Sequence, residues 1–474
     1  MSDTTESKGH VVVLGGGPGG YPAAFHAAHL GFKVTMIDAE SNPGGSCLLR
    51  GCIPSKALLH VAKLLHETQA AGEWGLVFEQ PALDLNKLRG WKDGIISKLS
   101  GGLAFSAKQR KVNHIRGRGK FLDPKNIHVD KLDGSTEKIS FDYCIVATGS
   151  RPAVIPSFPN QSPLLMDSTK ALALADIPQN LLVVGGGYIG LEMGTVYAAL
   201  GSHVTVVEAT GGLLPGADRD LVEFLAKRLN STFDSVLLNT KVLEVKEQAG
   251  KMAVKISGPD VKEADRVFDK VLVAVGRRPN SENIGLDLAG VQIDSKGFIK
   301  VDAQRRSNVP HIFAIGDVAG EPMLAHKATA EGRVAAEVLG GLPVTFQPNA
   351  IPAVVFTDPE IAWCGVTEVQ SRDLPAPARV LKFPWAASGR ATTLDRNDGM
   401  TKLIVDAKSE RILGVGIVGV GAGEMIAEGT LAVELGARAS DLKLTIHAHP
   451  TLSETMMETA ETFFGPSTHF MPRK

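Results

Sequence analysis

The sequence predicts an α/β fold with two Rossmann-like dinucleotide-binding domains and a C-terminal α+β domain. A strand–glycine loop–helix pattern occurs twice, with its first glycine at Gly15 and at Gly185. After Pro343 the chain alternates apolar strands with a helical pattern and carries no such loop. A chain of 474 residues predicts about three domains, and 44 % apolar residues can fill several cores.

The first copy of the pattern begins with the β-branched run Val11–Leu14, which is typical of a strand. A loop over 15–20 follows, with glycine at five of its six positions, and then a helical pattern over Tyr21–Leu30 that stops at a glycine. The next predicted strand, Lys33–Asp38, ends in a carboxylate 18 residues beyond the last loop glycine.

The second copy repeats each of these parts. A strand over Leu181–Val184 leads into a loop over 185–190, a helical pattern over Leu191–Leu200 and a strand over His203–Glu208. The final acid again lies 18 residues beyond the last loop glycine. One match to Gly-x-Gly-x-x-Gly is weak, but two matches that both have the strand, the helix and the acid are specific.

The fingerprint glycines have defined roles in binding a dinucleotide. The first permits a tight turn, the second lets the backbone approach a pyrophosphate, and the third allows close packing of helix and strand. These positions are Gly15, Gly17, Gly20, Gly185, Gly187 and Gly190. Asp38 and Glu208 can each accept a hydrogen bond from a ribose 2′-hydroxyl. Two sites suggest a flavin and a nicotinamide nucleotide, and the absence of arginine over 209–213 favours NAD over NADP at the second.

Two of the four cysteines, Cys47 and Cys52, have only four residues between them, whereas Cys144 and Cys364 lie far apart. A stapling disulfide here would gain only about 2 kcal/mol of chain entropy. A zinc half-site would need ligands that no further Cys-x-x-Cys or His-x-x-x-His set supplies. We therefore interpret the pair as a redox-active dithiol, and we predict no metal site.

The predicted domain limits follow from where apolar strands close on glycine. The runs 144–152 and 271–279 are expected to be crossings between the two nucleotide domains, and Ile312–Asp317 is another strand that ends on a carboxylate. The interpretation gives a discontinuous FAD domain over 1–150 and 280–345, an NAD domain over 151–279 and a dimerisation domain over 346–474.

The C-terminal domain is predicted from short strands and one helix. The strands are expected at Val354–Phe356, Lys402–Val405 and Ile412–Val415, and the helix at Glu424–Leu435. This alternation is typical of an α+β unit of about 125 residues.

Composition narrows the expected partners and compartment. The 50 basic residues nearly balance the 51 acidic ones, so neither nucleic acid nor a membrane is expected as a partner. The apolar run Ile412–Gly423 is too short to span a bilayer, and the run Val11–Phe25 is too rich in glycine, and lacks the cationic leader, for a signal peptide. Few cysteines and a transient catalytic disulfide indicate a reducing, cytoplasmic compartment.

The motifs together resemble the flavin-dependent pyridine nucleotide-disulfide oxidoreductases, and most closely the members that oxidise dihydrolipoyl groups. The resemblance covers the chain from Val11 to about Phe464. Its motifs are the two glycine loops and the segments Gly45–Lys56, Ala147–Pro152, Ala314–Asp317 and His447–Glu454.

The resemblance implies a role for each candidate site residue. Cys47 would meet the substrate, Cys52 would pack against FAD, and Lys56 would lie near the flavin and pair with Glu192. His449 would be the acid–base group, held by Glu454 and supplied by the other subunit of a homodimer. The remaining cofactor-binding candidates are Thr148, Gly149, Asp317, Ala325, Tyr188, Ile189 and Gly276.

The resemblance does not fix the role of the residues at two places in the chain. Tyr188 can either gate the nicotinamide or pack at the strand end. Leu49 and Arg50 replace the Asn-Val that is common between the cysteines, and Arg50 is expected to place a cation beside the thiols and to lower a thiol pKa.

The implied reaction is oxidation of a protein-bound dihydrolipoyl group, carried by an acyltransferase subunit or a lipoyl carrier protein, with NAD as the acceptor. A glutathione-type reductase is the main alternative, although it would use NADP and carry arginines near Glu208. A mercuric or thioredoxin-type reductase would need a second thiol pair near the C-terminus. A role chiefly as a binding subunit of a multienzyme complex also remains open.

Overall fold

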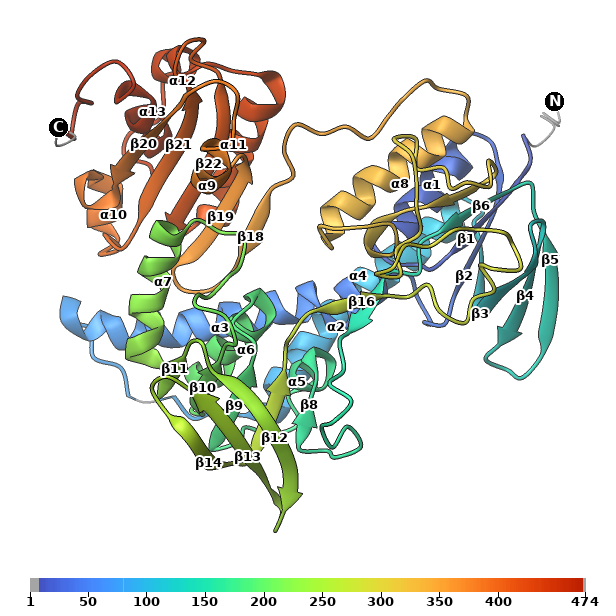
Figure 1. The fold of residues 1–474 in the computed structure, drawn as a ribbon, viewed down its shortest axis with the longest axis horizontal. Coiled ribbons are helices and arrows are strands. Elements are labelled where there is room, and N and C mark those ends of the chain that lie inside the picture. Colours follow the sequence, from blue (N-terminus) through green and yellow to red (C-terminus); the bar gives the residue numbers. More distant parts are fainter. Residues whose placement is uncertain (1–7, 80, 472–474) are drawn as a thin grey trace.

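The computed structural model describes residues 8–79 and 81–471. The predicted start of the first domain, at residue 1, and the predicted end of the last domain, at residue 474, therefore lie outside the described residues. Figure 1 shows three α/β bodies: the N-terminal body with its blue helix and teal strands, the green body, and the red C-terminal body. The fold class predicted from the sequence is confirmed. Within the described residues, no helix is long and apolar enough to cross a membrane.

The first body is built on a seven-stranded sheet. In spatial order its strands are β17 (Ile312–Ala314), β6 (Tyr143–Val146), β1 (His10–Leu14), β2 (Lys33–Asp38), β3 (Asn113–Asp123), β4 (Asn126–Lys131) and β5 (Thr136–Ser140). The first five pair in parallel, and the last two extend the sheet as an antiparallel meander.

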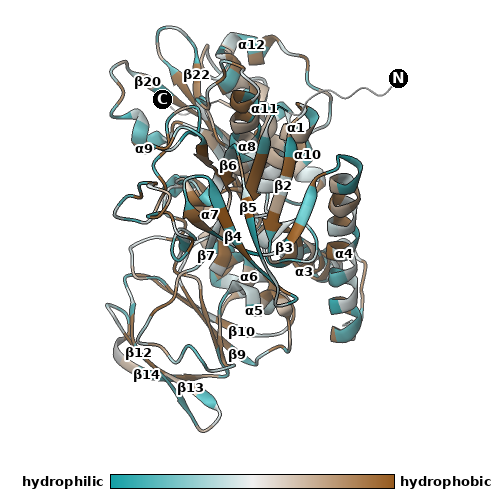
Figure 2. Cartoon of the chain, turned by 90° about the vertical axis from the view of Figure 1, so that its right-hand side faces the viewer, coloured by the Kyte–Doolittle hydropathy of each residue, from teal (hydrophilic) through white to brown (hydrophobic). Residues whose placement is uncertain are grey.

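Two helices cover one side of the parallel strands of the first body. They are α1 (Gly20–His29) and α8 (Ala325–Leu339), which pack against each other and share a core with β1 and β2. Strands β17, β6, β1 and β2 are mostly buried, as the continuous apolar runs predict for a parallel sheet covered on both faces, whereas β3 is largely exposed. Figure 2 shows β2 and β6 as brown, apolar strands among more polar loops.

The second body repeats the architecture with a five-stranded parallel sheet. The order is β11 (Ser235–Leu237), β10 (His203–Val207), β9 (Asn180–Val184), β15 (Lys270–Val273) and β8 (Leu165–Met166). An antiparallel sheet of β12 (Lys241–Gln248), β13 (Lys251–Gly258) and β14 (Lys262–Phe268) adjoins it. Helices α5 (Ser168–Ala173), α6 (Tyr188–Ala199) and α7 (Arg219–Thr232) complete the body.

The predicted helix after the second loop is wrong at its start. We expected Leu191–Leu200, whereas α6 begins at Tyr188. The reason is that Gly187 is the last non-helical residue, so Gly190 already lies in the first turn of the helix. The first helix differs by only one residue at each end.

The chain crosses between the first and second bodies on a two-stranded antiparallel ribbon. Its strands are β7 (Ser150–Pro152) and β16 (Arg277–Pro279), which pair through Ser150 and Pro279 at one end. Residues from the runs 144–152 and 271–279, which are far apart in the sequence, are thus neighbours in space.

The C-terminal body has a five-stranded antiparallel sheet in the order β18 (Ala353–Val355), β19 (Glu360–Gly365), β22 (Ile412–Gly419), β21 (Met400–Asp406) and β20 (Ala378–Pro384). Its helices are α9 (Glu368–Ser371), α10 (Gly389–Thr393), α11 (Ala422–Leu435), α12 (Ala439–Leu444) and α13 (Glu454–Glu461). The predicted α+β character is confirmed, and α11 begins two residues before the predicted helix.

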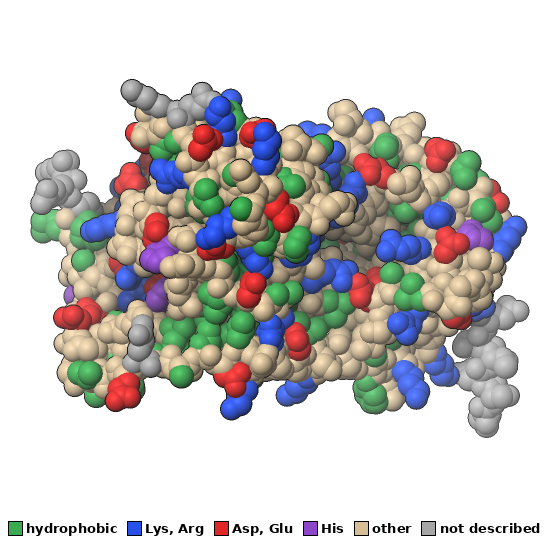
Figure 3. All heavy atoms as spheres, turned by 90° about the horizontal axis from the view of Figure 1, so that it is seen from below, with side chains coloured by type: hydrophobic (Ala, Val, Ile, Leu, Met, Phe, Trp, Pro, Cys, Tyr) green, Lys and Arg blue, Asp and Glu red, His purple; other side chains and the backbone are tan. Residues whose placement is uncertain are grey.

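Basic and acidic side chains are interspersed on the face of the molecule that Figure 3 shows. This distribution agrees with the balanced composition.

Candidate functional site

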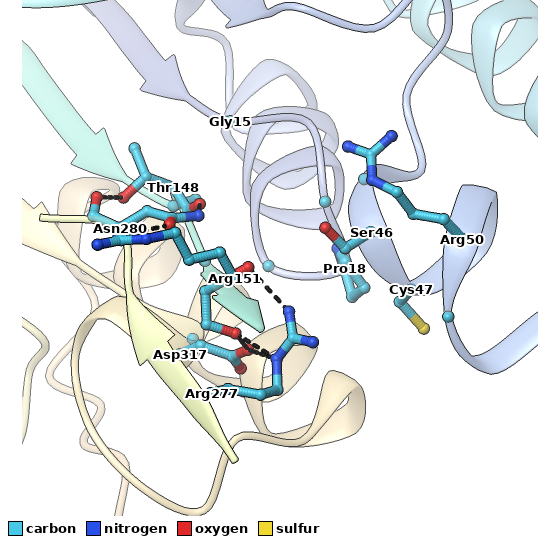
Figure 4. A pocket seen from close by; sticks show the side chains of 18 of the residues that line it. Gly15, Pro18, Ser46, Cys47, Arg50, Thr148, Arg151, Arg277, Asn280 and Asp317 are labelled. Atoms are coloured by element: carbon cyan, nitrogen blue, oxygen red, sulfur yellow. Dashed lines mark hydrogen bonds and ion pairs between the residues drawn. The ribbon is translucent and has the colours of Figure 1, made fainter. Parts of the chain in front are cut away.

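A cavity of about 830 Å³ lies where the first glycine loop, the dithiol segment and the first turn of α6 meet. Thirteen of the predicted site residues line it: Gly15, Gly17, Asp38, Cys47, Cys52, Lys56, Thr148, Gly149, Tyr188, Ile189, Glu192, Asp317 and Ala325. The segments that supply them are far apart in the sequence, and Figure 4 shows how several of them surround the cavity. The fold therefore assembles one continuous site for most of the predicted chemistry.

The remaining predicted residues lie outside this cavity. They are Gly20, Gly276, the second-loop residues Gly185, Gly187, Gly190 and Glu208, and the C-terminal pair His449 and Glu454. Gly20 packs behind the first loop, and the second-loop residues form their own nucleotide loop. His449 and Glu454 lie on the C-terminal body.

The two glycine loops share the requirement for glycine at their first and last fingerprint positions. Gly15 and Gly185 have φ of +105° and +111°, a region that favours glycine. A Cβ atom at Gly20 would lie 1.9 Å from the Gly15 carbonyl oxygen, and one at Gly190 would lie 2.3 Å from that of Gly185. The predicted roles of turn and close helix packing follow directly from these contacts.

The acid at the end of the second strand holds each loop. Asp38 Oδ2 accepts a hydrogen bond from the Gly16 amide at 2.5 Å, and Glu208 Oε2 accepts one from the Gly186 amide at 2.7 Å. These carboxylates therefore do more than the expected contact with a ribose, because they also fix the loop that faces the phosphates.

The first loop presents bare backbone to the cavity, as a pyrophosphate site requires. The nearest atom to a Cβ at Gly17 would be 3.8 Å away, so only the missing side chain keeps this space open. Helix α1 has Gly19 at its N-cap, with no side chain bound to its first amide groups. The Tyr21 amide donates to the Gly17 carbonyl at 3.1 Å and Pro22 has no amide hydrogen, so among the first three residues of the helix the Gly20 amide is left to bind an anion at its positive end.

The dithiol segment packs directly on this loop. Cys47 lies in α2 (Gly45–Arg50) and Cys52 begins α3 (Cys52–Ala70). The Gly44 amide donates to the Gly16 carbonyl at 2.8 Å, and a Cβ at Gly45 would lie 2.5 Å from Gly17 Cα. Glycine at 44 and 45 thus lets the sulfur-bearing helix approach the nucleotide loop.

Both cysteines are free thiols in the structure, and they affect each other's acidity. A hydrogen bond from the Cys47 thiol to Cys52 lowers the pKa of Cys52 to about 7, against the desolvation that opposes it, and the Lys56 ammonium lowers it further. The same hydrogen bond, with burial, raises the pKa of Cys47. Cys52 is therefore the thiol that carries the negative charge.

Lys56 has the partner that the resemblance implied. Its Nζ lies 2.8 Å from Glu192 Oε2 and 3.1 Å from Glu192 Oε1. Glu192 is buried and also accepts the Phe356 amide at 3.0 Å, while the Phe356 ring lies under the Lys56 ammonium. This backbone contact from the C-terminal body was not predicted, because nothing near Phe356 marks it in the sequence.

The thiol pair provides a test of this arrangement. In reduced, flavin-free protein we expect thiolate absorbance near 240 nm to rise with a midpoint near pH 7, because Cys52 is the more acidic thiol. Lys56→Met should raise that midpoint, since it removes a cation and leaves the Glu192 charge uncompensated. Lys63→Met removes an exposed lysine of the same helix and should leave it unchanged. A midpoint near 8.5 in all three proteins would contradict the assignment.

Asp317 is held by two residues that were not among the predicted site residues. Ser150 Oγ donates to Asp317 Oδ2 at 2.5 Å, and Arg277 Nε donates to Ser150 Oγ at 2.7 Å. Both residues lie in the crossing ribbon, directly after Gly149 and Gly276. Their position next to a glycine, within the runs 144–152 and 271–279, was the available signal, and Figure 4 shows Arg277 beside Asp317 at the cavity.

The Thr148 hydroxyl makes a hydrogen bond within the protein. Thr148 Oγ1 donates to the Asn280 carbonyl at 2.8 Å, and the Asn280 side-chain amide donates back to the Thr148 carbonyl at 2.9 Å. The pair closes the crossing ribbon at the cavity wall, and only the backbone of this turn remains to face a ligand.

His449 lies on the C-terminal body with an exposed imidazole. Its side chain is 72 % exposed, and its Nδ1 lies 2.9 Å from Glu454 Oε1. Burial acts to raise the pKa of Glu454, but hydrogen bonds from the Thr451 amide and from His449 hold it below its ordinary value. An ionised Glu454 orients the ring and leaves Nε2 free to exchange a proton.

Tyr188 stands at the wall where the two nucleotide-binding bodies meet. Desolvation raises the pKa of its hydroxyl to about 12, so it stays protonated at neutral pH. The side chain is partly exposed within the cavity, and both interpretations of its role, gate or packing, remain compatible with this position.

Asp218, Asp220 and Glu368 form the one cluster of metal-ligand type among the described residues. Lys402 Nζ lies between them, at 3.0, 2.5 and 2.8 Å from their respective oxygens. Because an ammonium group occupies the centre, these carboxylates act as an ion-pair cluster between the second and C-terminal bodies.

Comparison with known proteins assigns the class. Residues 9–332 match the pyridine nucleotide-disulphide oxidoreductase family, and residues 351–460 match its dimerisation domain. The dihydrolipoyl dehydrogenase of Vibrio cholerae is 49 % identical over 98 % of this chain and 97 % of its own, and that of Thermus scotoductus is 45 % identical over 98 % and 99 %. The chain therefore belongs to the pyridine nucleotide-disulphide oxidoreductases, and within them to the dihydrolipoyl dehydrogenase family.

Solved structures support the same fold. LpdA from Mycobacterium tuberculosis superposes with a TM-score of 0.88 at 28 % identity, covering 96 % of this chain and 99 % of that one. The HOCl-induced flavoprotein disulfide reductase RclA from Escherichia coli gives 0.84 at 28 % identity, covering 95 % and 99 %. FAD and NAD are the cofactors of this enzyme family, and the cavity and the two loops described above fit them.

Proposed function

We propose that the protein oxidises protein-bound dihydrolipoyl groups to the lipoyl disulfide and reduces NAD. The observation that carries this proposal is that the dithiol, the Lys56–Glu192 pair and the first nucleotide loop form the wall of one cavity. The identity of about 45 to 49 % to dihydrolipoyl dehydrogenases over nearly the whole chain favours this substrate over glutathione.

The reaction starts from the Cys47–Cys52 disulfide. His449 of the partner subunit takes the proton of one substrate thiol, and the resulting thiolate attacks the Cys47 sulfur and displaces Cys52 as a thiolate. The lower pKa of Cys52 makes it the better leaving group. The second substrate thiol then attacks the substrate sulfur joined to Cys47, which closes the lipoyl disulfide and releases Cys47 to be reprotonated.

Bound FAD would supply the route by which the electron pair of the dithiol reaches NAD, with reoxidation of the two cysteines to the disulfide. The chain's own contribution is to hold Cys52 as a thiolate beside Lys56 and to hold the loops at 15–20 and 185–190 for the two nucleotides. The net reaction converts a dihydrolipoyl group and NAD⁺ into a lipoyl disulfide, NADH and a proton.

The proposed assembly is a homodimer in which each dithiol uses the partner's His449. This arrangement is supported by the match to a dimerisation domain and by the exposed His449, which does not line the cavity of its own chain. The substrate would arrive on a lipoylated acyltransferase subunit or a lipoyl carrier protein of a multienzyme complex. Four cysteines that are all free thiols favour a reducing compartment, and we place the enzyme in the cytoplasm.

The test is an anaerobic titration of the flavin-containing protein with dihydrolipoamide, followed by addition of NAD. We expect a long-wavelength charge-transfer band after the first addition and stoichiometric NADH after the second. A flavin that does not respond to dihydrolipoamide but is reduced by NADPH would overturn the proposal in favour of a glutathione-type reductase.

Glu208 should set the preference for NAD over NADP. Glu208→Ala removes a charged acceptor worth about 1.5–3 kcal/mol, so we expect the KM for NAD to rise about tenfold or more while NADP is disfavoured less. Thr210→Val is the control, because it removes only the hydroxyl that contacts Glu208 at 2.7 Å. Steady-state kinetics with both nucleotides measure the change, and an unaltered NAD/NADP ratio would contradict the role.

A further inference from the structure

Arg50 lies between the two cysteines, but its guanidinium faces away from them. It is the last residue of α2 and lines the cavity beside Gly15, Gly17 and Pro18 of the first loop. Figure 4 shows its side chain extending toward that loop while the Cys47 sulfur points to the opposite side. The expectation that Arg50 lowers a thiol pKa therefore finds no support, because the cation that acts on both thiols is Lys56.

A continuous set of contacts fixes the guanidinium at this end of the cavity. Asp38 binds the Gly16 amide through Oδ2 and the Glu40 amide through Oδ1, at 2.8 Å. Glu40 Oε1 in turn lies 2.5 Å from an Nη atom of Arg50. The nucleotide loop, the acid at the end of β2 and the dithiol helix are thus linked through side chains.

The pairing with Glu40 leaves donor capacity on Arg50. A guanidinium has five N–H donors in a planar fork that matches phosphate oxygens, and its side chain is 39 % exposed here. Across the same part of the cavity lies the N-terminus of α1, whose N-cap residue Gly19 lines the cavity and brings no capping side chain. A pyrophosphate between these two groups would meet backbone donors on one side and a charged fork on the other.

We propose that Arg50 binds the pyrophosphate of FAD and thereby ties the dithiol helix to the cofactor. This inference rests on the FAD site of the proposed function and adds a cofactor-binding residue to it. Glu40 holds the guanidinium in place but, as an anion, opposes the ligand. The contribution of Arg50 is directed at the ADP half of the cofactor and leaves thiol acidity unaffected.

The experiment measures release of FAD from the holoenzyme. Each protein is diluted, the recovery of free-flavin fluorescence gives the dissociation constant, and displacement by ADP is measured in parallel across a salt series. We expect Arg50→Gln to weaken FAD and ADP about 10- to 100-fold, and to flatten the salt dependence, while Arg50→Lys has a smaller effect.

Two further variants separate this role from that of a simple ion pair. Arg228→Gln breaks the Arg228–Asp398 ion pair, which lies outside the cavity. This pair matches the Arg50–Glu40 pair in exposure: its side chains are 39 % and 32 % exposed, against 39 % and 30 % for Arg50 and Glu40. It should leave FAD affinity unchanged. Glu40→Gln frees the Arg50 charge, so FAD affinity should stay the same or increase.

The proposal is overturned if Arg50→Gln retains FAD as tightly as the wild type, or if Glu40→Gln weakens FAD as much as Arg50→Gln does. The second result would assign Arg50 only to the pair with Glu40. Failure of the proposed function is a separate outcome. A protein that binds FAD through Arg50 but is not reduced by dihydrolipoamide would contradict the proposed substrate and leave the proposal on Arg50 intact.

Discussion

His449→Gln is expected to lower kcat for dihydrolipoamide oxidation about 10²- to 10⁴-fold, the usual contribution of a positioned acid–base group. Glutamine occupies a similar volume but cannot take the proton of a substrate thiol. The thiolate is the attacking species in disulfide exchange, and a free thiol is largely protonated at neutral pH. The FAD spectrum of the oxidised enzyme should not change, because His449 is proposed to act on the substrate thiols and not to bind the cofactor.

His447→Gln is the matched control two residues away. His447 Nε2 lies 2.7 Å from Glu428, and its side chain is almost fully buried. Both ring nitrogens of this residue have partners within the C-terminal body, Glu428 and the Thr445 carbonyl, so neither is available to take a proton from a substrate thiol. We therefore expect kcat within a few-fold of the wild type and a lower melting temperature, which steady-state kinetics and thermal unfolding can separate.

A hybrid dimer tests whether the histidine acts across the subunit interface. Subunits carrying His449→Gln are mixed with subunits carrying Cys47→Ser, and each homodimer should be inactive. If His449 serves the partner's dithiol, random mixing in a two-fold dimer should restore about a quarter of wild-type activity. No recovery in proven hybrids would show that each site uses its own histidine.

The nucleotide loops could be predicted from the sequence because their geometry is local. The contact that demands glycine at Gly20 is with the Gly15 carbonyl five residues earlier, and Gly15 itself has a positive φ, so the spacing of residues encodes both, although the Ala147 carbonyl that also excludes a side chain at Gly15 comes from a distant segment. The dithiol was predicted for the same reason, since Cys47 and Cys52 are close along the chain. The largest shift of a helix start is at α6, where the loop residue Gly190 already belongs to the first turn, while α1 and α11 begin one and two residues before their predicted starts.

The supporting contacts could not be predicted, because they join distant segments. The Phe356 amide reaches Glu192 across 164 residues, and Arg277 reaches Ser150 across 127. No periodicity or spacing encodes such pairs. Arg50 shows a related difficulty: its position in the sequence is next to the thiols, but the helix directs its side chain to the other side of α2.

Lys402 is the clearest sequence signal of a structural feature that was not predicted. It interrupts the apolar strand β21, where all residues from Met400 to Val405 are buried, and a buried lysine requires partners of opposite charge. Those partners come from two other parts of the fold: Asp218 and Asp220 from the start of α7, and Glu368 from α9. A lone lysine in a buried strand predicts an acidic cluster, even though it cannot say which acids form it.

Lys402→Met is expected to destabilise the protein by about 3–5 kcal/mol, as removal of one partner from a buried ion pair usually does. Methionine fills the volume of a fully buried side chain but leaves three carboxylates close together, with only the half-exposed Lys382 to compensate them. Lys382→Met is the control and should cost less than about 1 kcal/mol, since that lysine is partly solvated. Urea unfolding of the flavin-containing protein measures both.

The pH dependence of this difference follows from the cluster. Burial acts to raise the pKa values of Asp220 and Glu368, but hydrogen bonds from Lys382 and Lys402 hold both below their ordinary values. Stability from such depressed carboxyl pKa values is present above the unfolded value of about 4 and is lost as the pH falls below it. The wild type should therefore lose more stability than Lys402→Met between pH 6 and about 3, so that the two unfolding free energies converge. A gap independent of pH would mean that Lys402 stabilises the junction through packing and not through its charge.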